Sequence, residues 1–119
     1  LMFSPELLDH FENPRNAGSL DPPAVAVRVE NPACGDILEL AARFEAGRIA
    51  DIRFRARGCT ASMAAGSALT ELAMGRDAAG LRALQATEVE AALGGLPNES
   101  KHAAVLAVDA ARALAARAS

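Results

Sequence analysis

Aromatic residues are scarce in this sequence of 119 residues: it has no tryptophan or tyrosine, and only 3% of its residues are aromatic. Hydrophobic residues still make up 51% of the chain, and alanine supplies many of them. We therefore expect a core of small and branched aliphatic side chains, which favours closely packed helices. The length predicts a single domain, residues 1–119, that buries its own core without disulfide bonds.

A net positive charge and long apolar runs are also missing. The formal net charge is -3, which argues against nucleic acid as a partner, because nucleic-acid binding needs a basic surface. No apolar run approaches the roughly 18 residues of a membrane-spanning helix. Asp9, Glu12 and Arg15 interrupt the only apolar start, so we expect neither a membrane partner nor a signal peptide. The expected location is the cytoplasm.

The motifs of common enzymes are absent as well. The sequence has no glycine-rich phosphate-binding loop, no Ser-His-Asp arrangement that its spacing supports, and no pair of carboxylates expected in a cleft. These absences argue against a kinase or a hydrolase.

Cysteine is rare too, and the neighbours of Cys34 and Cys59 indicate what these two residues do. Cytosolic thiols are kept reduced, so both are expected to be free or metal-bound. By default, free cysteines are buried packing residues. Here, however, Cys34 lies in the turn Asn31-Pro32-Ala33-Cys34-Gly35-Asp36 and Cys59 follows Gly58, so backbone surrounds each sulfur. Together with the Asp36 carboxylate, the two thiolates predict a metal site or a sulfur-handling site.

Alternating hydrophobicity predicts three strands, over residues 25–30, 38–45 and 52–57. The turn at Ala46-Gly47 reverses the chain between the second strand and the third. The second strand leads away from Cys34 and the third returns to Cys59. Both cysteines are therefore expected at the same end of an antiparallel meander.

Capping residues mark the first two predicted helices. Ser4 as N-cap and Pro5 at the first helical position begin a short N-terminal helix. A second helix begins at Thr60 and ends at Gly75. Its small residues form one face for close packing, and they are Ala61, Ala65 and Ala68.

The C-terminal part is predicted to be helical throughout. Two short helices span residues 77–84 and 87–93, the second with Thr87 as its N-cap. Asn98 is predicted to cap a long last helix whose buried side includes Val105. The expected fold class is α+β: a three-stranded antiparallel meander packed against helices, with a short helix at the N-terminus and a long one at the C-terminus.

Helix positions bear on Cys59 and on the two histidines. Cys59 lies at a helix N-terminus, where free N–H groups and the helix dipole favour an anionic thiolate. His102 lies in the first turn of the last helix, which is a similar kind of position, but a lone histidine there is by default a surface residue. His10, beside Asp9 in the first helix, is predicted to be a solvated surface residue.

Three motifs carry a resemblance to a known family. They are Asp9-His10-Phe11-Glu12-Asn13-Pro14-Arg15-Asn16 with Gly18, Asn31-Pro32-Ala33-Cys34-Gly35-Asp36, and Gly58-Cys59 running into a Ser- and Ala-rich helix with Thr70-Glu71. With these motifs the chain resembles the iron-sulfur cluster assembly scaffolds of the IscU and NifU N-terminal type over nearly its whole length. The resemblance implies a protein on which a [2Fe-2S] cluster is built with sulfur that a cysteine desulfurase delivers as persulfide. It also implies transfer of the cluster to carriers or recipient apo-proteins.

The last helix departs from the family pattern. The family has a histidine followed by a cysteine there, whereas this chain has His102 followed by Ala103. A ligand that is also the expected persulfide acceptor is therefore missing. The chain also lacks the Pro-Pro-Val-Lys run that a dedicated chaperone reads, so we do not expect that partner. The candidate ligands that remain are Cys34, Asp36, Cys59 and His102.

This ligand set fits two kinds of cargo. Four donors suit tetrahedral Zn²⁺, and they also suit a labile [2Fe-2S] cluster, since histidine is known in place of cysteine in such clusters. We rank a scaffold or carrier of a transient [2Fe-2S] cluster first. A zinc-bound sulfur acceptor or regulator of a cysteine desulfurase ranks second, and a cluster-free binding module of the same fold ranks third. Each hypothesis leaves the choice between a monomer and a homodimer open.

Overall fold

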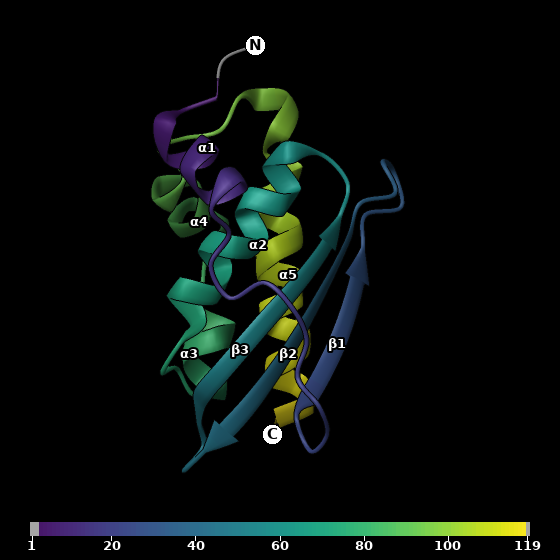
Figure 1. Cartoon of the computed structure of the whole chain (residues 1–119), viewed down its shortest axis with the longest axis vertical. Coiled ribbons are helices and arrows are strands. Elements are labelled where there is room, and N and C mark those ends of the chain that lie inside the picture. The colour runs from purple at the N-terminus through teal and green to yellow at the C-terminus, as the bar shows by residue number, and fades with distance from the viewer. Residues whose placement is uncertain (1–2, 119) are drawn as a thin grey trace.

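The computed structural model describes residues 3–118, and their three-stranded antiparallel sheet has the order β1-β2-β3 (Figure 1). The strands are β1, Val25–Glu30; β2, Ile37–Glu45; and β3, Arg48–Arg57. Leu40 of the central strand lies opposite Val27 on one side and Phe54 on the other. The predicted meander is confirmed, and the third strand begins earlier than predicted, directly after the turn at Gly47.

Alternation along the strands gives the sheet a buried face and a solvent-facing one. Leu40 and Phe54 point into the core and are 1% and 5% exposed, whereas Arg55 lies on the opposite face. Two long helices, α2 (Thr60–Ala73) and α5 (His102–Ala118), cover the buried face. As Figure 1 shows, α2 lies along β3, and α5 runs behind β1 and β2.

The shorter helices lie around this layer. They are α1 (Pro5–Glu12), α3 (Ala78–Ala83), α4 (Ala86–Ala92) and the 3₁₀ turn η1 (Asn98–Ser100). The predicted cap of α1 is confirmed, because Ser4 Oγ accepts a hydrogen bond from the Leu7 N–H at 2.9 Å. Between residues 3 and 118, none of the helices is long and apolar enough to cross a bilayer.

Small side chains let the helices approach the sheet closely. The predicted small face of α2 is fully buried, and a Cβ on Gly66 of the same helix would lie 2.6 Å from Cδ2 of Phe54. Leucines fill the remaining volume, and each contributes roughly 1.5–3 kcal/mol through its burial. The fully buried ones are Leu7, Leu38, Leu40, Leu69, Leu81, Leu84, Leu93 and Leu114. The prediction of a core made of small and branched aliphatic residues is confirmed.

The start of α4 was predicted wrongly. The helix begins at Ala86, with Gln85 rather than Thr87 as its N-cap residue. The Glu88 carboxylate explains the difference, because its Oε1 accepts a hydrogen bond from the Gln85 N–H at 3.3 Å. That contact satisfies the backbone N–H of Gln85, and it fixes Gln85 as the N-cap residue, two positions before Thr87.

The start of α5 and one of its buried positions also differ from the prediction. Asn98 begins a 3₁₀ turn, in which the Lys101 N–H donates to Asn98 O at 3.4 Å, and α5 begins only at His102. Val105 is 49% exposed, because α5 directs Leu106 and its alanines to the core instead. Adjacent apolar residues on a helix cannot all face one side.

The segment after α1 runs along the free edge of β3. The Gly18 N–H donates to Phe54 O, and the Phe54 N–H donates to Asn16 O, both at 2.9 Å. Asn16 Nδ2 also donates to Thr70 Oγ1 in α2 at 3.1 Å. The segment therefore protects an edge that would otherwise be open to pairing, and it ties α1 to the core.

Candidate metal centre

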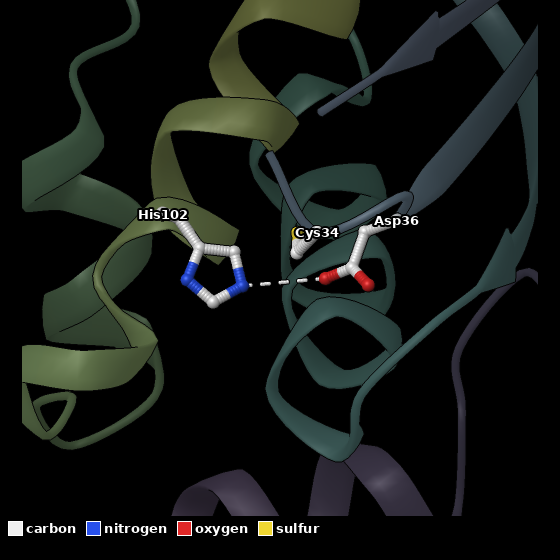
Figure 2. A group of neighbouring side chains, drawn as sticks. All are labelled: Cys34, Asp36 and His102. Atoms are coloured by element: carbon white, nitrogen blue, oxygen red, sulfur yellow. Dashed lines mark hydrogen bonds and ion pairs between the residues drawn. The ribbon is translucent and has the colours of Figure 1, made fainter. Parts of the chain in front are cut away.

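The structure brings the predicted ligands together where three segments meet at one end of the sheet. Cys34 and Asp36 lie in the turn between β1 and β2, Cys59 lies between β3 and α2, and His102 is the first residue of α5. Figure 2 shows the Asp36 carboxylate and the His102 ring directed toward one another, with Cys34 beside them. Residues that are far apart in the sequence thus share one site.

Asn31 shapes the turn that carries Cys34. Its side-chain oxygen accepts a hydrogen bond from the Ala33 N–H at 2.9 Å, and its carbonyl oxygen accepts one from the Gly35 N–H at 2.7 Å. Gly35 has a φ of 76°, a conformation that favours glycine. These local bonds form an Asx-type turn that leaves the sulfur of Cys34 exposed.

Three donor atoms are close enough to share one metal ion, and the sulfur of Cys59 lies beside two of them. Cys34 Sγ, a carboxylate oxygen of Asp36 and a ring nitrogen of His102 lie within 4.8 Å of one another. Cys59 Sγ lies 3.6 Å from Asp36 Oδ2 and 3.9 Å from His102 Nε2. Two soft thiolates with one imidazole and one carboxylate suit either Zn²⁺ or iron-sulfur chemistry.

Asp36 is the buried member of this group, with 5% of its surface exposed. Its Oδ2 accepts a hydrogen bond from Ser62 Oγ at 2.5 Å and lies 3.3 Å from His102 Nε2. Burial raises the pKa of the Asp36 carboxyl, but hydrogen bonds from Ser62, the two cysteines and His102 together outweigh burial and hold that pKa below its usual range. The carboxylate is therefore ionised and oriented at neutral pH.

Ser62 is a site residue that the sequence analysis missed. It is 2% exposed, and its Oγ lies 3.4 Å from Cys59 Sγ as well as within hydrogen-bond distance of Asp36. In the sequence it is one serine of a helix rich in serine and alanine. The available signal was its spacing, because a residue three positions after Cys59 shares its side of the helix.

Gly58 provides the space for Asp36. Its φ of 149° favours glycine, and a Cβ on it would lie 2.5 Å from Asp36 Cγ. Cys59 follows as the N-cap residue of α2, in extended conformation and without a side-chain capping bond. The sulfur of Cys59 is therefore left for the site rather than for the helix end.

His10 is not a surface residue, so that prediction was wrong. It is 7% exposed, and its Nδ1 lies 2.7 Å from Ser67 Oγ, which also accepts a hydrogen bond from the Arg15 N–H at 2.8 Å. Its Nε2 lies 3.6 Å from Glu71 Oε1. Burial, and then the charge of Arg15, lower the pKa of His10. These contacts dock α1 onto α2, away from the candidate ligands.

The fold and the site together define an α+β protein with thiol, carboxylate and imidazole groups gathered at one end of a meander. A family model described as the NifU-like N terminal domain matches residues 2–117, and the chain belongs to this family. The resemblance seen in the motifs is thereby confirmed.

Named relatives agree with this assignment, and a solved structure shares the fold. The chain is 39% identical over 111 residues to the iron-sulfur cluster assembly scaffold protein IscU 1 of Archaeoglobus fulgidus, covering 93% of this chain and 72% of that one. It is 37% identical over 117 residues to the iron-sulfur cluster assembly scaffold protein IscU of Azotobacter vinelandii, covering 95% and 91%. A crystal structure of a hypothetical protein matches with a TM-score of 0.74 at 27% identity, covering 94% of this chain and 95% of that one.

Proposed function

We propose that this chain is a scaffold or carrier that holds a labile [2Fe-2S] cluster on Cys34, Asp36, Cys59 and His102 and passes it on. The observation that supports this function is the meeting of both cysteines with a carboxylate and an imidazole at one end of the sheet. The family supports it too, because the relatives in Archaeoglobus fulgidus and Azotobacter vinelandii are named as iron-sulfur cluster assembly scaffolds. A scaffold holds cargo without turning over a substrate, so we place the protein outside the enzymes.

The donor set favours release of the cluster. Most [2Fe-2S] clusters are held by four cysteine thiolates, whereas this chain has two cysteines and carries Ala103 directly after His102. The oxygen of Asp36 is a harder ligand than a thiolate and suits iron in a cluster less well. We therefore expect a cluster that is held more weakly than on an all-thiolate site.

The proposed function also implies partners. Both thiols are exposed, which suits the transfer of sulfur from the persulfide of a cysteine desulfurase. Recipient apo-proteins or cluster carriers would then take up the finished cluster. We treat residues 1–119 as a single domain that works in the cytoplasm. Size-exclusion chromatography of the loaded protein separates a monomer from a homodimer.

A zinc-bound sulfur acceptor or regulator of a cysteine desulfurase is the second candidate. The observation that favours it is a group of three donors with the sulfur of Cys59 beside it, which together would suit tetrahedral Zn²⁺, and two accessible thiols that can accept sulfur. Such a protein would carry stoichiometric zinc as purified and would speed desulfurase turnover when added.

A cluster-free binding module of the same fold is the third candidate. In that case the exposed thiols of Cys34 and Cys59 would serve no chemistry. The variants Cys34→Ser and Cys59→Ser would then leave both partner binding and stability unchanged. Either scaffold or zinc chemistry instead makes both variants lose metal, because each removes a thiolate donor.

The test is iron, zinc and acid-labile sulfide analysis of protein that has been purified and reconstituted anaerobically, read together with its visible spectrum. We expect equal iron and sulfide with charge-transfer absorption in the wild type. Ala103→Cys, which adds a third thiol directly after His102, should slow the loss of iron to a chelator. Ala111→Cys is the matched control, because it adds a thiol at another buried alanine of α5, about two turns further along the helix from His102.

The outcomes separate the candidates. Absence of charge-transfer absorption in the wild type, with a full cluster in Ala103→Cys under the same protocol, would contradict the scaffold function. Zinc that resists replacement by iron and sulfide would favour the second candidate. Neither metal nor sulfide in the wild type or in Ala103→Cys would favour the cluster-free module.

A further inference from the structure

Oδ2 of Asp36 takes the polar contacts of three side chains. Ser62 Oγ donates to it at 2.5 Å, His102 Nε2 lies at 3.3 Å, and Cys59 Sγ donates at 3.6 Å. Ser62 and Asp36 are both buried, so their mutual hydrogen bond is shielded from water. Such a bond is a fixed part of the site, because breaking it would leave buried polar groups unpaired.

The other carboxylate oxygen, Oδ1, faces the backbone at Gly58. A Cβ on Gly58 would lie 2.5 Å from Asp36 Cγ and nearer still to Oδ1, so the carboxylate approaches the main chain very closely. Ser62 thus fixes the carboxylate at Oδ2, and the missing side chain of Gly58 leaves the space in which Oδ1 lies. The oxygen that faces Cys59 and His102 is Oδ2.

Ser62 differs from the other two donors to this oxygen. Cys59 and His102 belong to the proposed ligand set, and each gives up its contact with Asp36 when it turns a lone pair to a metal. The hydroxyl of Ser62 can keep its hydrogen bond to Oδ2 when the site is loaded. Building on the proposed function, we propose that Ser62 is a positioning residue that keeps Asp36 a single-oxygen ligand.

Whether Asp36 binds through one oxygen or through both decides the coordination number of the metal. A carboxylate can bind a metal through one oxygen or through both, and two-oxygen binding by Asp36 would raise a four-donor site to five metal-ligand bonds. Ser62 fixes the carboxylate through its hydrogen bond to Oδ2, so Oδ1 stays in the space that the missing side chain of Gly58 leaves rather than turning to the metal. The site then stays four-coordinate and tetrahedral, which is the geometry of structural zinc sites and of iron bound by sulfur ligands.

Ser67 provides a matched control on the same helix. It is fully buried, but its Oγ contacts His10 Nδ1 at 2.7 Å and accepts a hydrogen bond from the Arg15 N–H at 2.8 Å. Ser62→Ala and Ser67→Ala therefore both remove a buried hydroxyl from α2. Only Ser62→Ala removes a contact to Asp36.

Anaerobic titration of Co²⁺ into the metal-free wild type, Ser62→Ala and Ser67→Ala tests this role. The affinity and the intensity of the visible d–d bands are measured, because tetrahedral Co²⁺ absorbs strongly and a fifth ligand weakens the bands. We expect Ser62→Ala to bind about 10–100-fold more weakly, the typical loss when a hydrogen bond behind a metal ligand is removed, and to show weaker bands. Ser67→Ala should match the wild type in both measurements, even where thermal unfolding reports a lower stability.

Two results would overturn the role of Ser62 and leave the proposed ligand set standing. One is wild-type affinity and band intensity in Ser62→Ala, and the other is an equal loss in Ser62→Ala and Ser67→Ala, which would indicate packing rather than positioning. Failure of the wild-type protein to bind Co²⁺ at all would overturn the proposed ligand set, and the role of Ser62 with it.

Discussion

Replacing Gly58 with alanine tests whether the close approach of Asp36 to the main chain holds the site together. Gly58 has a φ of 149°, which residues other than glycine rarely adopt. The new Cβ would lie 2.5 Å from Asp36 Cγ and 3.0 Å from Asp36 Cβ. Because Asp36 is buried, Gly58→Ala has to displace either its carboxylate or the turn that leads into α2.

Strain and steric overlap both lower the stability of this variant. A non-glycine residue in such a conformation costs about 1–3 kcal/mol, and overpacking costs about 1–3 kcal/mol more. The free energy of unfolding should therefore fall by about 2–6 kcal/mol, against a typical total of about 5–15 kcal/mol. Displacing the carboxylate also disturbs one of the proposed ligands, so the affinity for Zn²⁺ should fall at least about tenfold.

Gly47→Ala is the matched control for the backbone strain. Gly47 has a φ of 78°, and among residues 3–118 no side chain or more distant backbone lies within 4 Å of a Cβ built on it. It lies in the turn between β2 and β3, at the end of the sheet opposite Cys34. The left-handed conformation alone should cost about 1–2 kcal/mol and leave the binding of Zn²⁺ unchanged.

Urea unfolding followed by circular dichroism measures the two losses of stability, and competition with a chelator measures the affinity for Zn²⁺. Circular dichroism without urea first establishes that each variant is folded, and a Gly58→Ala variant that does not fold at all exceeds the loss expected from backbone strain alone. Equal losses of stability in Gly58→Ala and Gly47→Ala, with wild-type affinity for Zn²⁺ in both, would refute the reasoning. That result would mean that Asp36 does not depend on a glycine beside it.

Three further predictions follow from the contacts of single residues. Burial, and then the charge of Arg15, depress the pKa of His10 in the folded state. Its contribution to stability is therefore complete above roughly pH 6.5, the ordinary pKa of histidine, and is lost as the pH falls through the depressed pKa. His10→Gln should flatten the dependence of urea midpoints on pH below roughly 6.5, the ordinary pKa of histidine. Gly66→Ala should lower the free energy of unfolding. Overlap with the Phe54 ring costs about 1–3 kcal/mol, which exceeds the gain of about 1 kcal/mol in helix propensity. Thermal melts that show a more stable variant would contradict this prediction. His102→Ala should weaken Zn²⁺ at least about tenfold in chelator competition while leaving the melting temperature close to that of the wild type, since His102 is only half-buried.

Most of the fold could be predicted because its signals are local. A period of two in hydrophobicity gives each strand, and the short turn at Gly47 joins the second strand to the third. An antiparallel meander then leaves little choice about where its ends lie, so the meeting of Cys34 and Cys59 at one end could be deduced without any long-range information. The position of Cys59 at the start of α2 is equally local.

The errors concern contacts between residues far apart in the chain. His10 lies among charged neighbours in the sequence, yet its buried partner Ser67 lies on α2. The sequence pattern of the first helix cannot show which other helix will cover His10. Ser62 was missed for the same reason, because its contact with Asp36 links α2 to a turn before β2. Val105 was assigned to the core from its apolar character alone, although α5 has smaller residues on the side that packs.

The burial of the proposed ligands indicates where cargo is exchanged under the proposed function. Asp36 lies inside, held by Ser62 and Gly58, whereas the sulfurs of Cys34 and Cys59 lie at the surface. Incoming sulfur and a recipient protein can therefore reach the thiols without displacing the carboxylate. Under the proposed function, the buried oxygen would stay in place while cargo is exchanged at the two exposed sulfurs. A recipient that offers more thiolates than this chain would draw the cluster away, because soft ligands hold iron-sulfur clusters better than a carboxylate does.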